Sequence, residues 1–235
     1  MRIVRVLLTL LVALTLPAAP VLAADVTDTT PLTAFHKVRV DGMAEVTLRR
    51  GEKESVAVTV PVRQRDHVRV QVVDGELRIR AETHRNWWSS WSSPKTPRIA
   101  IVYREIDTVQ LAGAVKLRAL ELRARTLTLV ASGASTMDIV DIASDRLRVD
   151  GAGAVKARLA GRVATQDVTI SGAGKYDASL LVSDDADVEV SGAGKVAVHA
   201  DRKLRLNLSG AASVRYRGNP EVTRHVTGAA SIHHS

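Results

Sequence analysis

Three tryptophans lie close together in a serine-rich stretch, and their rings are suited to contact with a ligand. The stretch covers residues 86–94, and the rings are Trp87, Trp88 and Trp91. Exposed indole rings beside polar side chains can stack on sugars or lie at a membrane interface. The alternative is that they fold back and plug one end of the fold or a groove between domains. Because the stretch separates two strand-like segments, it is predicted to be a loop.

Lysines recur at one position of an internal repeat, three residues after a glycine. The residues at this position are Lys116, Thr136, Ala154, Lys175, Lys195, Ser213 and Ser231. If the repeats stack, the position forms a column on one outward face, and its lysines could attract an anionic polymer. The alternative is a solvated face whose charges prevent strand edges from pairing.

Carboxylates are the next candidates for chemistry. Asp184, Asp185 and Asp187 form the densest acidic cluster in the sequence. Solenoid enzymes that cleave acidic sugars use carboxylates, often with calcium, together with a basic proton acceptor. The Gly-Gly-x-Gly-x-Asp calcium repeat is absent from this sequence, and no acid–base pair recurs at one position of the repeat. A turn is therefore the simpler interpretation of these aspartates.

Metal, cofactor and nucleic-acid sites have little support in the sequence. His225, His233 and His234 lack the spacing of metal ligands. Gly-Ala-Gly triplets lack the strand–loop–helix context of a phosphate-binding loop. The absence of cysteine excludes disulfides, thiolate zinc sites, iron–sulfur clusters and cysteine nucleophiles. We predict no cofactor and no nucleic-acid partner.

The composition is that of a folded domain with an aliphatic core. The chain has 235 residues, of which 46% are hydrophobic, 25% are charged and only 3% are aromatic. With so few rings, the core must consist of Val, Leu, Ile and Ala. The formal net charge of +8 is compatible with anionic partners such as lipopolysaccharide or acidic polysaccharide. It is also an ordinary charge for a small soluble domain.

A Gly-Ala pair recurs seven times in the second half of the chain, at intervals of 18 to 21 residues. The glycines are Gly113, Gly133, Gly151, Gly172, Gly192, Gly210 and Gly228. Apolar residues stand two and four positions before each glycine and four after it, except that Arg224 precedes the last one. This alternation predicts a strand on each side of a glycine bend, followed by a polar turn.

A strand repeat of this period predicts a parallel β-solenoid in which each repeat forms one coil. Stacked coils place equivalent residues above one another, and we expect the alanine after each glycine to face a narrow interior. An antiparallel sandwich or barrel is the main alternative. It does not require the same Gly-Ala pair in every unit, so the solenoid is favoured.

Residues 35–105 continue the β pattern without the clean repeat. Alternation over residues 35–48 is interrupted at Gly42, and Asp74-Gly75 is a hairpin signal. The region is predicted to form either degenerate coils of the solenoid or a cap over its first open edge.

Residues 1–23 have the pattern of a secretory signal peptide. Arg2 and Arg5 form a basic start, an apolar run follows over residues 6–16, and Val21-Leu22-Ala23 provides a cleavage pattern. The run is too short for an uncleaved anchor to span a bilayer comfortably. We therefore expect export to the periplasm, the cell surface or the medium, with no transmembrane segment in the mature chain.

Several motifs, taken in order, resemble the head GIN domain family. They are Phe35-x-x-Val38-x-Val40-x-Gly42, Asp74-Gly75-x-Leu77-x-Ile79, four Ser-Gly-Ala units at 132–134, 171–173, 191–193 and 209–211, and Val214-x-Tyr216-x-Gly218-x-Pro220. The family comprises exported bacterial proteins described as candidate autotransporter adhesins. The resemblance implies an all-β, β-helix-like fold and a cell-envelope setting, and it carries over no catalytic residues.

These patterns predict four segments and a ranked set of functions. The segments are a signal peptide (1–23), a linker (24–34), an N-terminal β region (35–105) and a Gly-Ala repeat solenoid (106–235). The leading hypothesis is a non-enzymatic envelope protein that presents a repetitive surface to a glycan, lipopolysaccharide or another envelope protein. The alternatives are a periplasmic enzyme or binding protein acting on acidic polysaccharide, and a structural role through end-to-end stacking of coils.

Overall fold

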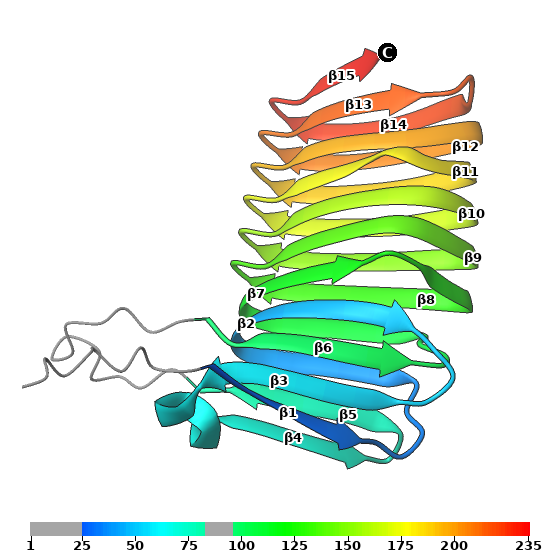
Figure 1. Ribbon diagram of the computed structural model, residues 1–235. Coiled ribbons are helices and arrows are strands. Elements are labelled where there is room, and N and C mark those ends of the chain that lie inside the picture. Colours follow the sequence, from blue (N-terminus) through cyan, green and yellow to red (C-terminus); the bar gives the residue numbers. More distant parts are fainter. Residues whose placement is uncertain (1–24, 83–95) are drawn as a thin grey trace, which may run out of the picture.

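Alternation of apolar and polar residues produces long strands that wind into a stack of coils (Figure 1). The figure shows a computed structural model that describes residues 25–82 and 96–235. Its elements are β1 (Asp25–Pro31), β2 (Lys37–Arg50), β3 (Ser55–Pro61), the 3-10 helix η1 (Val62–His67), β4 (Val68–Val73), β5 (Glu76–Ala81), β6 (Arg98–Tyr103), β7 (Thr108–Ala119), β8 (Leu122–Gly133), β9 (Thr136–Gly153), β10 (Lys156–Gly172), β11 (Lys175–Gly192), β12 (Lys195–Gly210), β13 (Ser213–Arg217), β14 (Glu221–Gly228) and β15 (Ser231–His234).

The predicted parallel β-solenoid is confirmed. From β8 to β12, each strand pairs in parallel with the equivalent strand of the next coil over most of its length. The solenoid has about six turns. Each coil bends at a glycine corner and again at a second corner, where the register shifts next to Ala160 in β10. Parallel pairing of this extent excludes the antiparallel sandwich for the repeat region.

The corner glycines form one column, and the register corrects one of its predicted members. The glycine column comprises Gly42, Gly113, Gly133, Gly153, Gly172, Gly192, Gly210 and Gly228. The prediction of Gly151 is wrong. Gly153 pairs with Gly133 and Gly172, whereas Gly151 pairs with Ile170 and is buried. Because Gly-Ala occurs twice in succession here, spacing alone could not distinguish the two glycines.

Two constraints explain why the column consists of glycine. From Gly113 onward its members have φ between +80° and +121°, which L side chains rarely adopt. A Cβ on any of them would also lie 2.4–2.8 Å from the carbonyl oxygen of the glycine in the preceding coil. This close stacking allows hydrogen bonds along the corner, such as the one that Ala154 N donates to Gly133 O at 2.8 Å.

The alanines that follow the glycines are exposed, contrary to the expectation that they face the interior. Ala114, Ala134 and Ala154 all lie on the outside of the corner. Residues at even offsets from the glycine face the core, so an offset of one places alanine outside. In the coils of Gly113 and Gly153, the interior of the corner is filled by the residue two positions after the glycine, which is Val115 or Val155.

The N-terminal region supplies both a first coil and a cap. β2 pairs in parallel with β7, and its Gly42 begins the glycine column. β5 and β6 pair in parallel with the other edge of β2, on either side of Gly42. β3 and β1 then extend β6 in antiparallel fashion, and β4 does the same for β5. Both predicted roles are therefore present. β2 forms the first coil, and the strands added to its other edge form the cap.

Aliphatic side chains fill the interior as one continuous cluster, with a small polar network inside it. Gln166 Nε2 donates to Ser183 Oγ at 2.7 Å, and the Tyr176 hydroxyl donates to Gln166 Oε1 at 3.2 Å. Ser183 Oγ donates to the His199 carbonyl oxygen at 2.7 Å. Because these groups satisfy one another, their burial carries no unpaired polar atom. Burial also raises the pKa of Tyr176.

The last coil is the most exposed part of the stack. β14 and β15 have few half-buried and no fully buried residues. Arg224 of β14 pairs with Leu206, at a register position that apolar residues occupy in the preceding coils. A further coil stacked here would cover the guanidinium group, which is unfavourable. This end is therefore poorly suited to end-to-end stacking of copies.

Candidate functional site

Lysines from consecutive coils stand in a column beside the glycine corner. The corrected register adds Lys156, which pairs with Lys175, and Lys175 pairs in turn with Lys195. We call these three residues the lysine triplet. Neighbouring strands lie about 4.8 Å apart, so the triplet concentrates three cations on one edge of the face. Lys116 lies two coils earlier in the same column, separated from the triplet by Thr136.

Sequence reasoning missed Lys156 because it counted the repeat from Gly151. Counting from Gly153 places Ala154 at the glycine corner and Lys156 in the lysine column. A signal for this was present in the sequence. The motif Gly-Ala-x-Lys occurs at 113–116, 153–156, 172–175 and 192–195.

The lysine triplet has no carboxylate partner in the described part of the chain. Lys116 differs, because its Nζ contacts Glu45 Oε1 at 3.2 Å. Lys156, Lys175 and Lys195 are exposed and make no ion pair with any described residue. Adjacent ammonium groups without counter-charges repel one another and attract an external anion.

Small side chains border the lysine column on the side of the glycine corner. The units Ser171-Gly172-Ala173 and Ser191-Gly192-Ala193 expose almost nothing larger than a methyl or hydroxyl group. The Ser171 hydroxyl donates to the Gly151 carbonyl oxygen at 3.4 Å. An extended polymer could approach the lysines from this side without meeting a bulky side chain.

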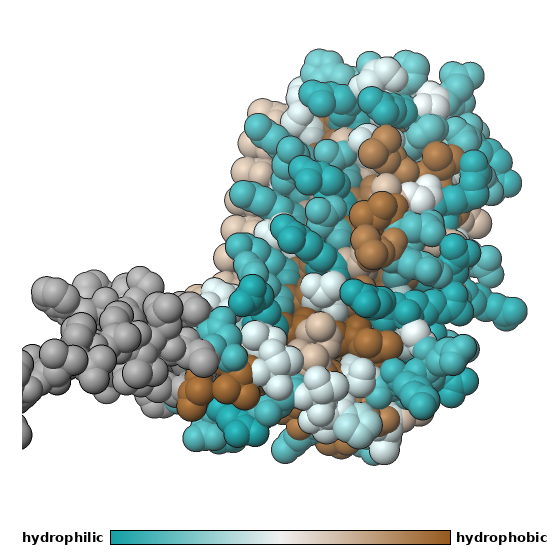
Figure 2. All heavy atoms as spheres, in the orientation of Figure 1, coloured by the Kyte–Doolittle hydropathy of each residue, from teal (hydrophilic) through white to brown (hydrophobic). Residues whose placement is uncertain are grey.

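Two further columns run along the same face, toward the second corner. The charge column consists of Arg118, Asp138, Arg158 and Asp177. The apolar ridge consists of Leu120, Val140, Ala160 and Leu180. The first three directly follow residues that pair with one another, Ala119, Ile139 and Leu159, and Ala160 pairs with Leu180. The three large members of the ridge expose 68%, 58% and 65% of their surface, which is high for Leu and Val. Figure 2 shows apolar side chains gathered in a run across the coils, between hydrophilic margins.

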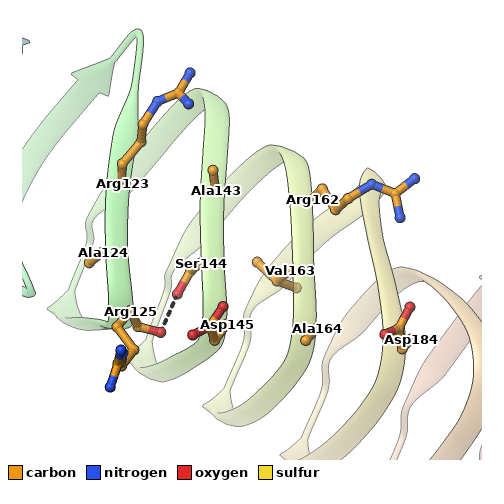
Figure 3. Close-up of a pocket in the computed structure, with 10 residues that line it drawn as sticks. All are labelled: Arg123, Ala124, Arg125, Ala143, Ser144, Asp145, Arg162, Val163, Ala164 and Asp184. Carbon is orange, nitrogen blue, oxygen red and sulfur yellow. Dashed lines mark hydrogen bonds between the residues drawn. The ribbon is translucent and has the colours of Figure 1, made fainter.

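A shallow groove lies beyond the second corner, with a volume of about 670 Å³ (Figure 3). Its charged lining residues are Arg123, Arg125, Arg162, Asp145 and Asp184. Small residues, including Ala143 and Ala164, lie between these long side chains and make the surface hollow. The groove therefore offers hydrogen-bond donors and acceptors together, without a dominant charge.

One of the groove arginines is already neutralised. Arg123 Nε contacts Glu121 Oε1 at 2.6 Å, and its Nη2 contacts Asp141 Oδ2 at 3.1 Å. The hydrogen bond and charge of Glu121 raise the pKa of Arg123, with a smaller contribution from Asp141. In return, the hydrogen bond from Arg123 lowers the pKa of Glu121. The groove is thus a weaker attractor of anions than the lysine triplet.

The acidic cluster forms ion pairs between coils. Asp185 accepts two hydrogen bonds from Arg202, the shorter at 2.6 Å, and Asp187 accepts one from Arg205 at 2.7 Å. The hydrogen bond from Arg202 lowers the pKa of Asp185. A carboxylate held ionised in this way is suited to bracing two strands and unsuited to donating a proton.

The remaining predicted site residues divide into two groups. Trp87, Trp88 and Trp91, like the predicted signal peptide at residues 1–23, lie outside the described residues. The histidines near the end of the sequence are described, and His234 Nε2 contacts the Gly218 carbonyl oxygen at 2.8 Å. Within residues 25–82 and 96–235, no three His, Asp or Glu side chains gather as potential metal ligands.

Comparison with known proteins connects this architecture to a family. The family described as "Putative auto-transporter adhesin, head GIN domain" matches residues 34–220. The chain belongs to the head GIN domain family. The resemblance predicted from the motifs in residues 35–220 is therefore confirmed. No curated protein matches the chain.

Solved structures share the fold of this head GIN domain protein. A putative adhesin from Bacteroides fragilis has 17% identity and a TM-score of 0.82, over 90% of this chain and 97% of that one. A putative lipid binding protein from Parabacteroides distasonis has 15% identity and a TM-score of 0.70, over 90% of this chain and 96% of that one. At such identities the similarity shows the fold alone. None of the helices in the described ranges is long and apolar enough to cross a membrane.

Proposed function

We propose that this head GIN domain protein is an exported, non-enzymatic envelope protein that binds acidic polysaccharide chains through its lysine column. The observation that carries the proposal is the lysine triplet, Lys156, Lys175 and Lys195, which stands on consecutive coils without carboxylate partners. The family's description as a "putative auto-transporter adhesin" and the structural neighbours described as putative adhesins support a binding role.

The geometry of the triplet suits an extended anion better than a compact one. The three cations lie along the solenoid axis, at a spacing of about 4.8 Å per coil. A polymer that carries one carboxylate or phosphate every sugar unit could contact several of them at once. The neighbouring Ser-Gly-Ala units leave the approach unobstructed. The polysaccharide portion of lipopolysaccharide is a ligand of the same chemical class.

The tryptophans are proposed as a second set of contacts. Their segment joins β5 to β6, which pair with β2 on either side of Gly42. Ala81 and Arg98, the described strand residues on either side of it, lie at the glycine corner, the corner that borders the lysine column. Indole rings in this segment could stack on sugars of a chain that the lysines hold.

The enzyme alternative is less well supported. Asp185 and Asp187 are engaged by arginines, and the described carboxylates whose pKa is shifted, Asp185 and Glu121, are shifted downward. General acid catalysis on a glycosidic bond requires a carboxyl group with a raised pKa. Release of reducing ends from an acidic polysaccharide on incubation with the purified protein would support the enzyme instead.

The test uses polygalacturonate as the probe at low salt. We expect the triple variant K156A/K175A/K195A to bind at least about tenfold more weakly than the unaltered protein, because three surface contacts are lost. The control K37A/K53A/K203A removes the same charge at three exposed lysines elsewhere, and it should bind normally. A W87A/W88A/W91A variant that keeps its stability but loses affinity would support the tryptophan contacts. Equal binding by the two lysine variants would contradict the proposal.

A further inference from the structure

The charge column alternates in sign over four consecutive coils. In stacking order its members are Arg118, Asp138, Arg158 and Asp177, and each pairs with the next. None of them forms an ion pair with a described residue. Asp177 accepts hydrogen bonds from the amide and hydroxyl of Ser179, and its carboxylate stays half-buried. The face thus presents an ordered series of charges that are not used as ion pairs within the chain.

The apolar ridge runs beside the charge column, two residues farther along the strand in three coils and three residues farther at Leu180, where the register shifts. Single exposed apolar residues are common on soluble proteins. Here Leu120, Val140 and Leu180 occupy one column, and each exposes more than half of its surface. A column of exposed apolar side chains next to an ordered charge series is typical of a surface that is covered in an assembly.

We propose that this face binds a second copy of the same chain, with the two solenoids antiparallel and the two charge columns facing each other. The twofold axis would lie along the strands, between the coils of β9 and β10. This axis places Arg118 against Asp177 of the second copy, and Asp138 against Arg158 of the second copy. By symmetry the reverse pairs also form, so all four positions meet an opposite charge.

The apolar ridge is self-complementary under the same operation. Leu120 meets Leu180 of the second copy, and Val140 meets Ala160 of the second copy. A large side chain meets a large one at each end of the patch, and a smaller pair lies in the middle. A parallel arrangement would instead place like charges against each other, which disfavours it.

The lysine column lies at the rim of the proposed interface. Glu45 would meet Lys195 of the second copy, which is favourable, whereas Lys116 would meet Lys175 of the second copy. Lys116 is already paired with Glu45 in its own chain. At a solvated rim, salt and water screen the remaining repulsion. The side of each lysine column that faces the glycine corner would remain accessible along one edge of the dimer.

The area of the face fits a reversible dimer rather than a permanent one. Six coils at about 4.8 Å and about five residues at about 3.3 Å give a patch of roughly 500 Å² per copy. Two such patches bury about 1,000 Å² in total, the lower limit for a specific interface. We therefore expect a monomer–dimer equilibrium that shifts with protein concentration.

Two charge variants test the pairing directly. R118D/R158D makes the whole column acidic, and D138R/D177R makes it basic. Sedimentation equilibrium should show the unaltered protein dimerising with concentration, and each variant alone as a monomer. An equimolar mixture of the two variants should dimerise again, because acidic positions then face basic ones. The control R146D/R224D, which carries the charge change of the acidic variant at exposed positions elsewhere, should dimerise normally.

In R118D/R158D and D138R/D177R, four like charges stack in one column and could prevent folding. A second kind of variant therefore tests the dimer without changing any charge. L120S/L180S leaves the charge column intact and changes only exposed side chains, and it should weaken dimerisation at least about tenfold. Failure of folded, mixed variants to associate would overturn the proposal. A monomeric unaltered protein that sediments with phospholipid vesicles, and loses this in L120S/L180S, would overturn it in favour of a lipid surface.

Discussion

At the scale of single residues, Gly153 and Gly151 differ sharply although both precede alanine. Gly153 has φ +97°, and a Cβ there would lie 2.7 Å from the Gly133 carbonyl oxygen. At Gly151 a Cβ would meet Ile170 Cδ1 at 2.9 Å, the far end of a flexible side chain. The backbone of a neighbouring coil cannot give way, whereas an isoleucine rotamer can.

Alanine substitutions at these two positions test the corrected register. Gly153→Ala should lower the free energy of unfolding by about 3 kcal/mol or more, because strain and a backbone clash combine. Gly151→Ala should cost less than about 1 kcal/mol, because a methyl group can be accommodated beside Ile170. Denaturant unfolding of both variants measures the difference. A larger loss for Gly151→Ala would contradict the assignment of Gly153 to the glycine column.

Tyr103 gives the stability a dependence on alkaline pH. It is buried, and its hydroxyl donates to the Glu121 carbonyl oxygen. Burial first, and then the Glu121 carboxylate, raise the pKa of Tyr103 to about 12, against the opposing effects of Arg50 and Arg123. The folded state therefore favours the neutral phenol more than the unfolded state does, where the pKa is about 10.

The free energy of unfolding should consequently be unaffected by this tyrosine below about pH 10 and should fall between about pH 10 and pH 12. The loss attributable to Tyr103 is up to about 3 kcal/mol over that range. Tyr176, whose pKa burial also raises, adds to the decline in the same direction. Tyr103→Phe should show a shallower decline in denaturant unfolding at successive alkaline pH values. An unchanged decline would show that Tyr103 does not carry the effect.

At the scale of elements, strands are held more firmly the more neighbours they have. β9, β10 and β11 pair on both sides and bury alternate residues, whereas β14 and β15 bury none completely. Amide hydrogen exchange should therefore be slowest in β9 to β11 and fastest in β14 and β15, since local opening follows burial and pairing. Uniform protection along the stack would contradict this gradient.

Period-two alternation was sufficient to predict the strands and their stacking, because burial of one face imposes it directly. The exact register was not fully predictable, since it depends on which of two glycines has a positive φ. The order of the N-terminal strands in the sheet was also not predictable from the sequence. β5 and β6 lie outside β2 in the stack although they follow it in the chain, and no residue pattern records such a change of order.

The candidate site, like the fold, was predicted from the sequence only in part. Lys116, Lys175 and Lys195 were found by their spacing, and the structure places them in one column. Lys156 and Gly153 were both missed because the repeat was counted from Gly151. The apolar ridge has no simple sequence signal, because outward apolar residues at the second corner look like core residues until the coils are closed.

At the scale of the whole molecule, the solenoid converts a sequence repeat into parallel columns of side chains. One face carries the lysine column, the charge column and the apolar ridge side by side. The alternating charges of the charge column favour binding of a second copy of the chain. The uniform positive charge of the lysine triplet favours binding of a polyanion. The charge column and the apolar ridge form the centre of the proposed dimer face, and the lysine column forms its rim.

The most direct test of the proposed function is the salt dependence of binding to polygalacturonate. Each released counterion adds to the slope of log K against log salt concentration, by about 0.7 to 0.9 per neutralised charge for nucleic-acid polyanions. The K156A/K175A/K195A variant should therefore show a slope shallower by about two, whereas K37A/K53A/K203A should keep the slope of the unaltered protein. Identical slopes for both variants, or no binding by the unaltered protein at low salt, would contradict the central role of the lysine column.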